Sequence, residues 1–209
     1  MPQDPDDALP PTAPAALPAA LPAALPPYRG IGLADVRLVK SEHDAADART
    51  ALLAADVIGF DTESKPTFLK GEVSTGPHLV QLATDQRAYL FQIGAAPALE
   101  VLKLVLESAS ILKVGFGLGD DVKRLRAKLG IEAVNVLDLS TALRRGERNT
   151  LGAKTAVARY FGQHLQKSKK ITTTNWAMPR LSEKQILYAA DDAHVALKIY
   201  RHWRNLPAG

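Results

Sequence analysis

The stretch Val57-Ile58-Gly59-Phe60-Asp61-Thr62-Glu63 constrains the fold of this chain more than any other part of its sequence. Apolar residues run into two acids, a pattern typical of a buried strand that ends at a polar edge. Because side chains alternate along a strand, Asp61 and Glu63 project on the same side. Two neighbouring carboxylates repel each other unless a cation lies between them. A buried strand that simply ends in two solvated acids explains this stretch equally well, so the rest of the chain has to separate the two interpretations.

The chain has 209 residues, of which 46% are hydrophobic, enough for one sizeable core. Residues 1–28 do not belong to that core, because seven prolines lie between positions 10 and 27, spaced by alanine and leucine. Proline at this density prevents a stable helix and leaves little to pack. We therefore expect a disordered tail over 1–28 and a single folded domain over 29–209.

Charge and composition restrict the partners and the metals that this chain could bind. The tail holds three of the 22 acids and no Lys or Arg, so the domain keeps 19 acids against 26 basic residues, a balance of +7. This balance suits a polyanion, although it is also common in soluble proteins. The chain has no cysteine and five histidines, so any metal would be held by oxygen atoms, which favours Mg²⁺ or Mn²⁺ over structural zinc.

The sequence predicts a cytoplasmic protein with no membrane partner. The N-terminus carries Asp4, Asp6 and Asp7 where a secretory signal would be basic. No later segment reaches the unbroken apolar length of a membrane span.

Strand and helix patterns alternate along the domain. Strands are predicted at 36–39, 57–61, 79–84, 88–93, 111–114 and 134–137, and helices at 41–55, 97–108, 120–129, 150–160 and 182–204. Ser41, with Asp44 three residues later, is predicted to cap the first helix. This order predicts an α/β fold in which a mixed sheet is flanked by helices.

The closing helix carries a second unusual pattern. Tyr188 and Asp192 are four residues apart, so they lie on one face of the helix, which Val195 and Ile199 continue. A polar pair on the same face as buried residues is expected to contact something specific. The alternative is a Tyr–Asp surface pair above a row of core residues.

A third acidic position, Asp121, follows Gly117 by four residues. Together, Phe60-Asp61-Thr62-Glu63, Gly117-x-x-x-Asp121 and Tyr188-x-x-x-Asp192 resemble the motifs of the DEDD exonucleases with tyrosine in the third motif. Ribonuclease D and the Werner-type exonuclease domain belong to this family. The resemblance spans about 35–203 and also includes Leu79-Val80-Gln81-Leu82, Val114-Gly115-Phe116-Gly117 and Thr174-Asn175-Trp176.

The resemblance implies a ribonuclease H-like fold and hydrolysis of DNA or RNA from a free 3′ end, with release of 5′-mononucleotides. It also implies two divalent ions, Mg²⁺ or Mn²⁺, held by four carboxylates. By resemblance, Asp61 would bridge both ions, Glu63 and Asp192 would complete the first site, and Asp121 would hold the second ion through waters. Tyr188 would hydrogen-bond the attacking water, as an orienting group rather than a base.

Several other residues are assigned supporting roles. Asp120 is interpreted as a helix cap, Asp191 as a solvated neighbour, Asp138 as structural, and Trp176 as a packing residue rather than a base-stacking one. Ser64 stands where the family often has a bulky residue, and Phe68 could substitute for it. Phosphate contacts are expected from five basic residues, although each alone could simply be solvated: Lys123, Arg124, Lys167, Lys169 and Lys170.

Two other functions are compatible with parts of this pattern. The first is a catalytically silent module on the same fold that binds nucleic acid or a protein, and the second is a phosphatase for small nucleotides. The presence of all four acids and the tyrosine favours the exonuclease over the silent module. End-labelled DNA and RNA would separate these functions.

Overall fold

The computed structural model describes residues 24–67, 71–94, 98–144 and 149–207 of the chain. Within these ranges, six strands form one sheet in the order β1-β4-β3-β2-β5-β6. The strands are β1 (Val36–Val39), β2 (Val57–Glu63), β3 (Leu79–Ala83), β4 (Ala88–Gln92), β5 (Leu112–Gly115) and β6 (Val136–Asp138). Since β3 runs antiparallel to β2 and β4 while the other neighbours are parallel, the sheet is mixed, as predicted.

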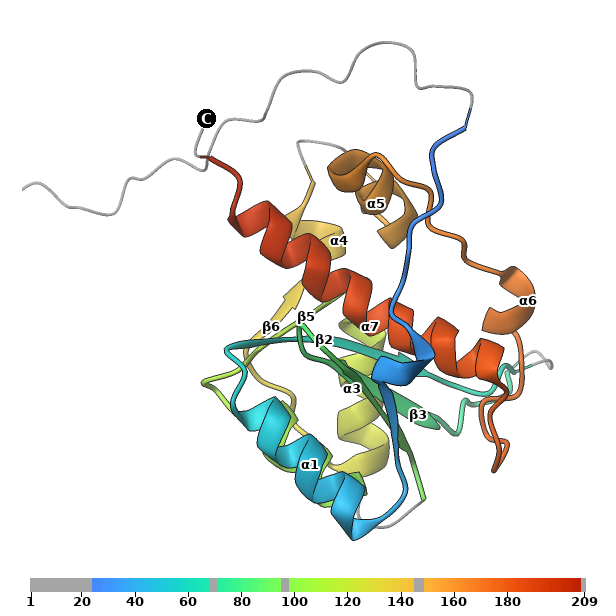
Figure 1. Ribbon diagram of the computed structural model, residues 1–209. Helices are drawn as coiled ribbons and strands as arrows, with labels where there is room; N and C mark the ends of the chain where they lie inside the picture. Colours follow the sequence, from blue (N-terminus) through green and yellow to red (C-terminus); the bar gives the residue numbers. More distant parts are fainter. Residues whose placement is uncertain (1–23, 68–70, 95–97, 145–148, 208–209) are drawn as a thin grey trace, which may run out of the picture.

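Helices cover both faces of this sheet (Figure 1). One face packs against α1 (Glu42–Leu53), α2 (Ala98–Leu106) and α3 (Gly119–Leu129). The long helix α7 (Glu183–Arg204) crosses the other face, together with α5 (Ala153–Phe161) and the short elements η1 (Leu33–Asp35), α4 (Leu139–Ala142) and α6 (Lys169–Thr172). Among the helices in the described ranges, none combines the length and apolar character that crossing a membrane requires.

The predicted elements are all present, and their ends differ from the predicted ends by at most three residues. At the start of α1, Ser41 accepts a hydrogen bond from the Asp44 backbone N–H, and the Asp44 carboxylate accepts one from the Ser41 backbone N–H, which confirms the cap. The sequence did not predict α4 and α6, because four residues are too few to show a helical period.

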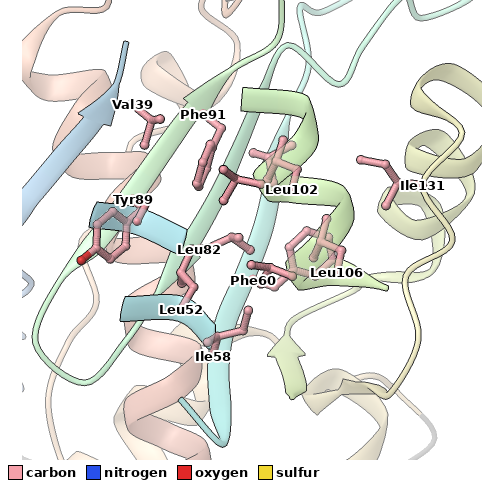
Figure 2. Close-up of a cluster of buried hydrophobic side chains, with 14 of the residues drawn as sticks. Val39, Leu52, Ile58, Phe60, Leu82, Tyr89, Phe91, Leu102, Leu106 and Ile131 are labelled. Carbon is pink, nitrogen blue, oxygen red and sulfur yellow. The ribbon is translucent and has the colours of Figure 1, made fainter. Parts of the chain in front are cut away.

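The face of the sheet that packs on α1, α2 and α3 holds the largest apolar cluster. Phe60 of β2, Leu82 of β3 and Phe91 of β4 meet Leu102 and Leu106 of α2 there, and all five side chains are fully buried (Figure 2). Burying one such side chain stabilises a fold by about 1.5–3 kcal/mol. This cluster therefore anchors the strand that carries Asp61.

The contact between α7 and β2 is unusually close. A Cβ atom at Gly59 would lie 1.9 Å from the backbone oxygen of Ala193, so only glycine fits there. Ala189, Ala190 and Ala193 are fully buried, and their small side chains let α7 lie directly on the sheet. As a result, the middle of α7 is fixed against the strand that ends in the two acids.

The folded domain begins before the predicted boundary at residue 28. Tyr28 donates its backbone N–H to the His164 oxygen at 2.9 Å, and His164 donates to the Pro26 oxygen at 2.8 Å. The Tyr28 ring stacks on Phe161, with ring centroids 5.9 Å apart. The prediction was therefore wrong for residues 26–28, because proline can still offer its carbonyl to a neighbouring segment. Residues 1–23 lie outside the described part of the chain.

We expect Gly59→Ala to destabilise the protein, because the added methyl group meets backbone rather than a movable side chain. Overpacking of this kind costs about 1–3 kcal/mol. Urea denaturation of the metal-free protein would measure the loss. Gly119→Ala is the matched control, since a Cβ at that position meets nothing within 4 Å. Equal stability of the two variants would contradict the close contact.

Candidate active site

The acids predicted to act together come from three separate elements. Asp61 and Glu63 lie at the end of β2 and are partly buried, while Asp121 in the first turn of α3 and Asp192 in the middle of α7 are buried. The charges of Asp192 and Asp121 act on both Asp61 and Glu63, so these four carboxylates form one cluster. The structure therefore brings together the four acids that the sequence analysis selected.

The carboxyl groups of the acidic cluster, defined as Asp61, Glu63, Asp121 and Asp192, have raised pKa values. Burial raises the pKa of Glu63 to about 9, with a further contribution from Asp61. Burial, followed by repulsion from Asp192 and Asp121, raises the pKa of Asp61 well above its usual range. The pKa of Asp121 is also raised by burial, although a hydrogen bond from Thr62 opposes this rise. A nearby divalent cation would reverse these shifts, and carboxylate oxygens are the ligands that Mg²⁺ and Mn²⁺ prefer.

Thr62 and Lys167 complete the cluster, and the sequence analysis did not assign either of them there. The Thr62 hydroxyl donates a hydrogen bond to Asp121. The Lys167 ammonium lies 2.7 Å from Asp192 Oδ1, with 28% of its side chain exposed. Burial lowers the pKa of Lys167, but attraction to Asp192 and Asp61 outweighs this effect and raises it overall. In this structure the Lys167 ammonium is paired inside the acidic cluster, and its contact with a substrate phosphate stays a prediction.

The donor set fits a divalent cation in its chemistry, but the side chains are not arranged around one. Within the described residues, no three metal-ligating side chains are grouped so that they could hold an ion as they stand. Asp192 is paired with Lys167, and Asp121 is bonded to Thr62. A cation that binds Asp192 would compete with the Lys167 ammonium for this carboxylate.

Tyr188 borders the acidic cluster on α7. Its hydroxyl lies 2.8 Å from Thr172 Oγ1, and its ring centroid lies 5.7 Å from Lys167 Nζ. Burial, followed by the charge of Asp192, raises the pKa of Tyr188 to about 12. The hydroxyl therefore stays protonated at neutral pH and can orient a water molecule, but it is unsuited to act as a base.

The other predicted basic residues lie at different distances from the acidic cluster. Arg124 Nη1 is 3.9 Å from Asp121 Oδ1, so this guanidinium borders the cluster. Lys123 instead pairs with Asp120 at 3.3 Å. Lys169 and Lys170 are exposed on the short helix α6. Of these four, Arg124 is the one placed beside a member of the cluster.

A basic pocket next to Tyr188 was not predicted, because its residues are distant in sequence and each is ordinary by itself. It encloses about 450 Å³ between α7, α5 and the segment before α6. Its charged lining includes Lys154, His164, Lys184 and Asp191. A larger cleft of about 690 Å³ lies at the opposite end of β2, beside Asp56, and contains none of the clustered acids. The smaller pocket adjoins the acidic cluster, because Lys167 and Tyr188 line it.

Two of the supporting assignments were wrong. Asp120 does not cap α3, because the N-cap residue is Leu118 and Asp120 pairs with Lys123. Asp191 is not a solvated neighbour, since it is half-buried and accepts a hydrogen bond from the Ile31 backbone N–H at 2.7 Å. In each case the partner is fixed by the tertiary fold.

Two other supporting assignments are confirmed. Asp138 is structural, because its carboxylate accepts hydrogen bonds from the backbone N–H groups of Gly117, Leu118 and Ser140. Trp176 is fully buried and packs against Tyr188.

Ser64 and Phe68 are the two residues considered at the position where the family often has a bulky side chain. The hydroxyl of Ser64 is buried. Phe68 lies outside the described residues.

Comparison with known proteins gives the same assignment as the motifs. A family model described as 3′-5′ exonuclease matches residues 36–206. The exonuclease/helicase WRN of Mus musculus is 31% identical over 163 residues, covering 77% of this chain and 12% of that protein. A 3′-5′ exonuclease of Arabidopsis thaliana is 28% identical over 156 residues, covering 72% of this chain and 53% of that protein. The chain thus spans only part of each of these relatives.

The fold of this chain is similar to that of several solved structures. The Nibbler EXO domain of Aedes aegypti superposes with a TM-score of 0.72 at 25% identity, covering 84% of this chain and 90% of that one. RNase D of Trypanosoma brucei, in complex with RNA U12, superposes with a TM-score of 0.72 at 22% identity, covering 82% of this chain and 63% of that one. Because the family model spans nearly the whole described sheet with its helices, this chain belongs to the 3′-5′ exonuclease family, and the resemblance inferred from its motifs is confirmed.

Proposed function

We propose that this protein is a metal-dependent exonuclease that hydrolyses phosphodiester bonds of DNA or RNA from a free 3′ end and releases 5′-mononucleotides. The observation that carries this proposal is the acidic cluster, in which four carboxylates from three elements are packed together with raised pKa values. Such a cluster costs free energy unless cations neutralise it, and it therefore supports a function that depends on cations.

The proposed cofactors are two Mg²⁺ or Mn²⁺ ions. Asp61 would contact both ions, Glu63 and Asp192 would complete one site, and Asp121 would hold the other. Two divalent ions, when bound, stabilise negative charge on the attacking and the leaving oxygen of a phosphodiester.

The remaining roles belong to side chains of the protein itself. Tyr188 keeps its proton at neutral pH and orients the attacking water, while the contact with Thr172 restrains its hydroxyl. Arg124 is the best-placed guanidinium for a substrate phosphate, because it already borders Asp121. Lys123, Lys169 and Lys170 are exposed and can contact phosphates further from the reacting bond.

The proposed substrate is a nucleic-acid strand with a free 3′ end. The related Trypanosoma brucei RNase D structure contains RNA, which supports RNA as one substrate, while WRN and its relatives support the 3′ polarity. The 2′-hydroxyl is the group that distinguishes the two sugars. A comparison of matched DNA and RNA strands would therefore identify the preferred one.

The first experiment incubates DNA and RNA oligonucleotides, labelled at either end, with the protein and Mg²⁺ or Mn²⁺. We expect a descending ladder from the 5′ label and immediate release of one mononucleotide from the 3′ label. Asp61→Asn should lower the rate at least about 100-fold, because it keeps the shape of the side chain but removes the negative charge of a proposed metal ligand. Asp120→Asn is the matched control, an exposed acid one position from Asp121. Binding without hydrolysis would instead identify a catalytically silent module.

The second experiment replaces Tyr188 with Phe. Loss of an orienting hydroxyl should lower kcat by about 10²–10⁴-fold, with little change in Mn²⁺ affinity or melting temperature. Tyr200→Phe, on the same helix, controls for the loss of a tyrosine hydroxyl from α7. If kcat of Tyr188→Phe stays within about twofold of the parent, the tyrosine only packs.

The third experiment replaces Lys167 with Met. The metal-free variant should be less stable, because breaking a buried ion pair costs up to about 3–5 kcal/mol. Mn²⁺ should bind more tightly by calorimetry, since no ammonium competes for the Asp192 carboxylate. Lys169→Met, on the adjacent exposed helix, should change neither quantity. Weaker Mn²⁺ binding in Lys167→Met would show that the lysine supports the loaded site rather than competing with the cation.

A further inference from the structure

Gln81, in the middle of β3, is buried in an unusual way. Its side chain is 0% exposed, and neither Nε2 nor Oε1 has a hydrogen-bond partner among the described residues. An unpaired buried amide costs about 1–3 kcal/mol. Nearly all buried polar groups in folded proteins are hydrogen-bonded, so an exception needs a reason.

Packing alone does not explain a glutamine at this position. All five residues of β3 are buried, and the two that share a face with Gln81 are the apolar Leu79 and Ala83. An apolar side chain of similar size would fill the same volume without burying an amide. We therefore expect the buried amide of Gln81 to have a function other than packing.

The register of the sheet places Gln81 directly beside Asp61. The two residues are paired across the antiparallel strands β2 and β3. Directly opposed residues project on the same face, with Cβ atoms about 4.5–5.5 Å apart. That face is the one covered by α7, because Gly59, two residues before Asp61, lies against Ala193. The amide thus neighbours the central acid of the cluster.

The Asp61 carboxylate can accept a hydrogen bond from a further donor. Its Oδ1 accepts one hydrogen bond, from the Thr62 backbone N–H at 2.9 Å. A carboxylate offers about four acceptor sites, and carboxylates that ligate metals are themselves held by hydrogen bonds. A glutamine Nε2 can donate such a bond without adding charge.

We propose that Gln81 is a positioning residue: its amide N–H, which is unpaired among the described residues, donates a hydrogen bond to the Asp61 carboxylate when this acid binds cations, and so fixes the orientation of the carboxylate. This inference rests on the proposed metal chemistry and adds a determinant of metal affinity outside the four acids. Gln81 does not touch substrate. It acts through Asp61.

The test replaces Gln81 with Met, which keeps the unbranched shape and removes the amide. We expect the melting temperature of the metal-free variant to equal or exceed that of the parent, because an unpaired polar group is gone. Calorimetry should show Mn²⁺ binding weakened about 10–100-fold. Leu82→Met is the matched control, since the next residue on β3 is equally buried but lies in the cluster on the opposite face.

A lower metal-free melting temperature with unchanged Mn²⁺ affinity would overturn the inference, because the amide would then serve the fold. Gln81→Leu repeats the measurement with a second apolar side chain. If neither variant folds, the amide is required for folding and the inference is overturned. A parent protein that binds no Mn²⁺ would overturn the proposed metal chemistry as well, whereas parent-like binding in Gln81→Met overturns only the role of Gln81.

Discussion

The backbone contact between α7 and β2 is the constraint on which the rest of the structure depends. Gly59 and the alanines of α7 let a 22-residue helix lie against the central strand without intervening side chains. Asp192 reaches the end of β2 because of this contact, and Asp61 and Glu63 acquire a third acid on the covered face. A larger residue at position 59 would separate the helix from the strand and with it the two halves of the acidic cluster.

The apolar clusters on both faces of the sheet stabilise a fold in which four acids lie close together, although repulsion between these acids destabilises it. Burial is the main cause of the raised pKa values of Glu63 and Asp61, and a second cause is repulsion between the like charges. In the metal-free protein, the Lys167 ammonium and the Thr62 hydroxyl partly relieve it. The fold thus keeps four acids close together while limiting the cost of their repulsion, a conflict that is common at functional sites.

Local patterns predicted most of the fold and the chemical identity of the site. The alternation in β2, the cap at Ser41 and the helical spacing of Tyr188 and Asp192 each depend on residues close in sequence. Local patterns failed where a partner is distant: Pro26 and Tyr28 pair with His164, and Asp191 binds Ile31. Nothing in the sequence around these residues indicates which distant segment will supply their hydrogen-bond partners.

By itself, the sequence predicted an α/β fold, because strand and helix periods are local properties, and the resemblance of its motifs to a known family selected the four acids and the tyrosine. Only the tertiary structure decided that Lys167 turns inward to Asp192 and that Thr62 bonds Asp121. It also decided that Gln81 lies opposite Asp61, which follows from strand register. Strand register, burial and the identity of the lysine that pairs with Asp192 all depend on contacts between distant segments. Those contacts exist only after the chain has folded.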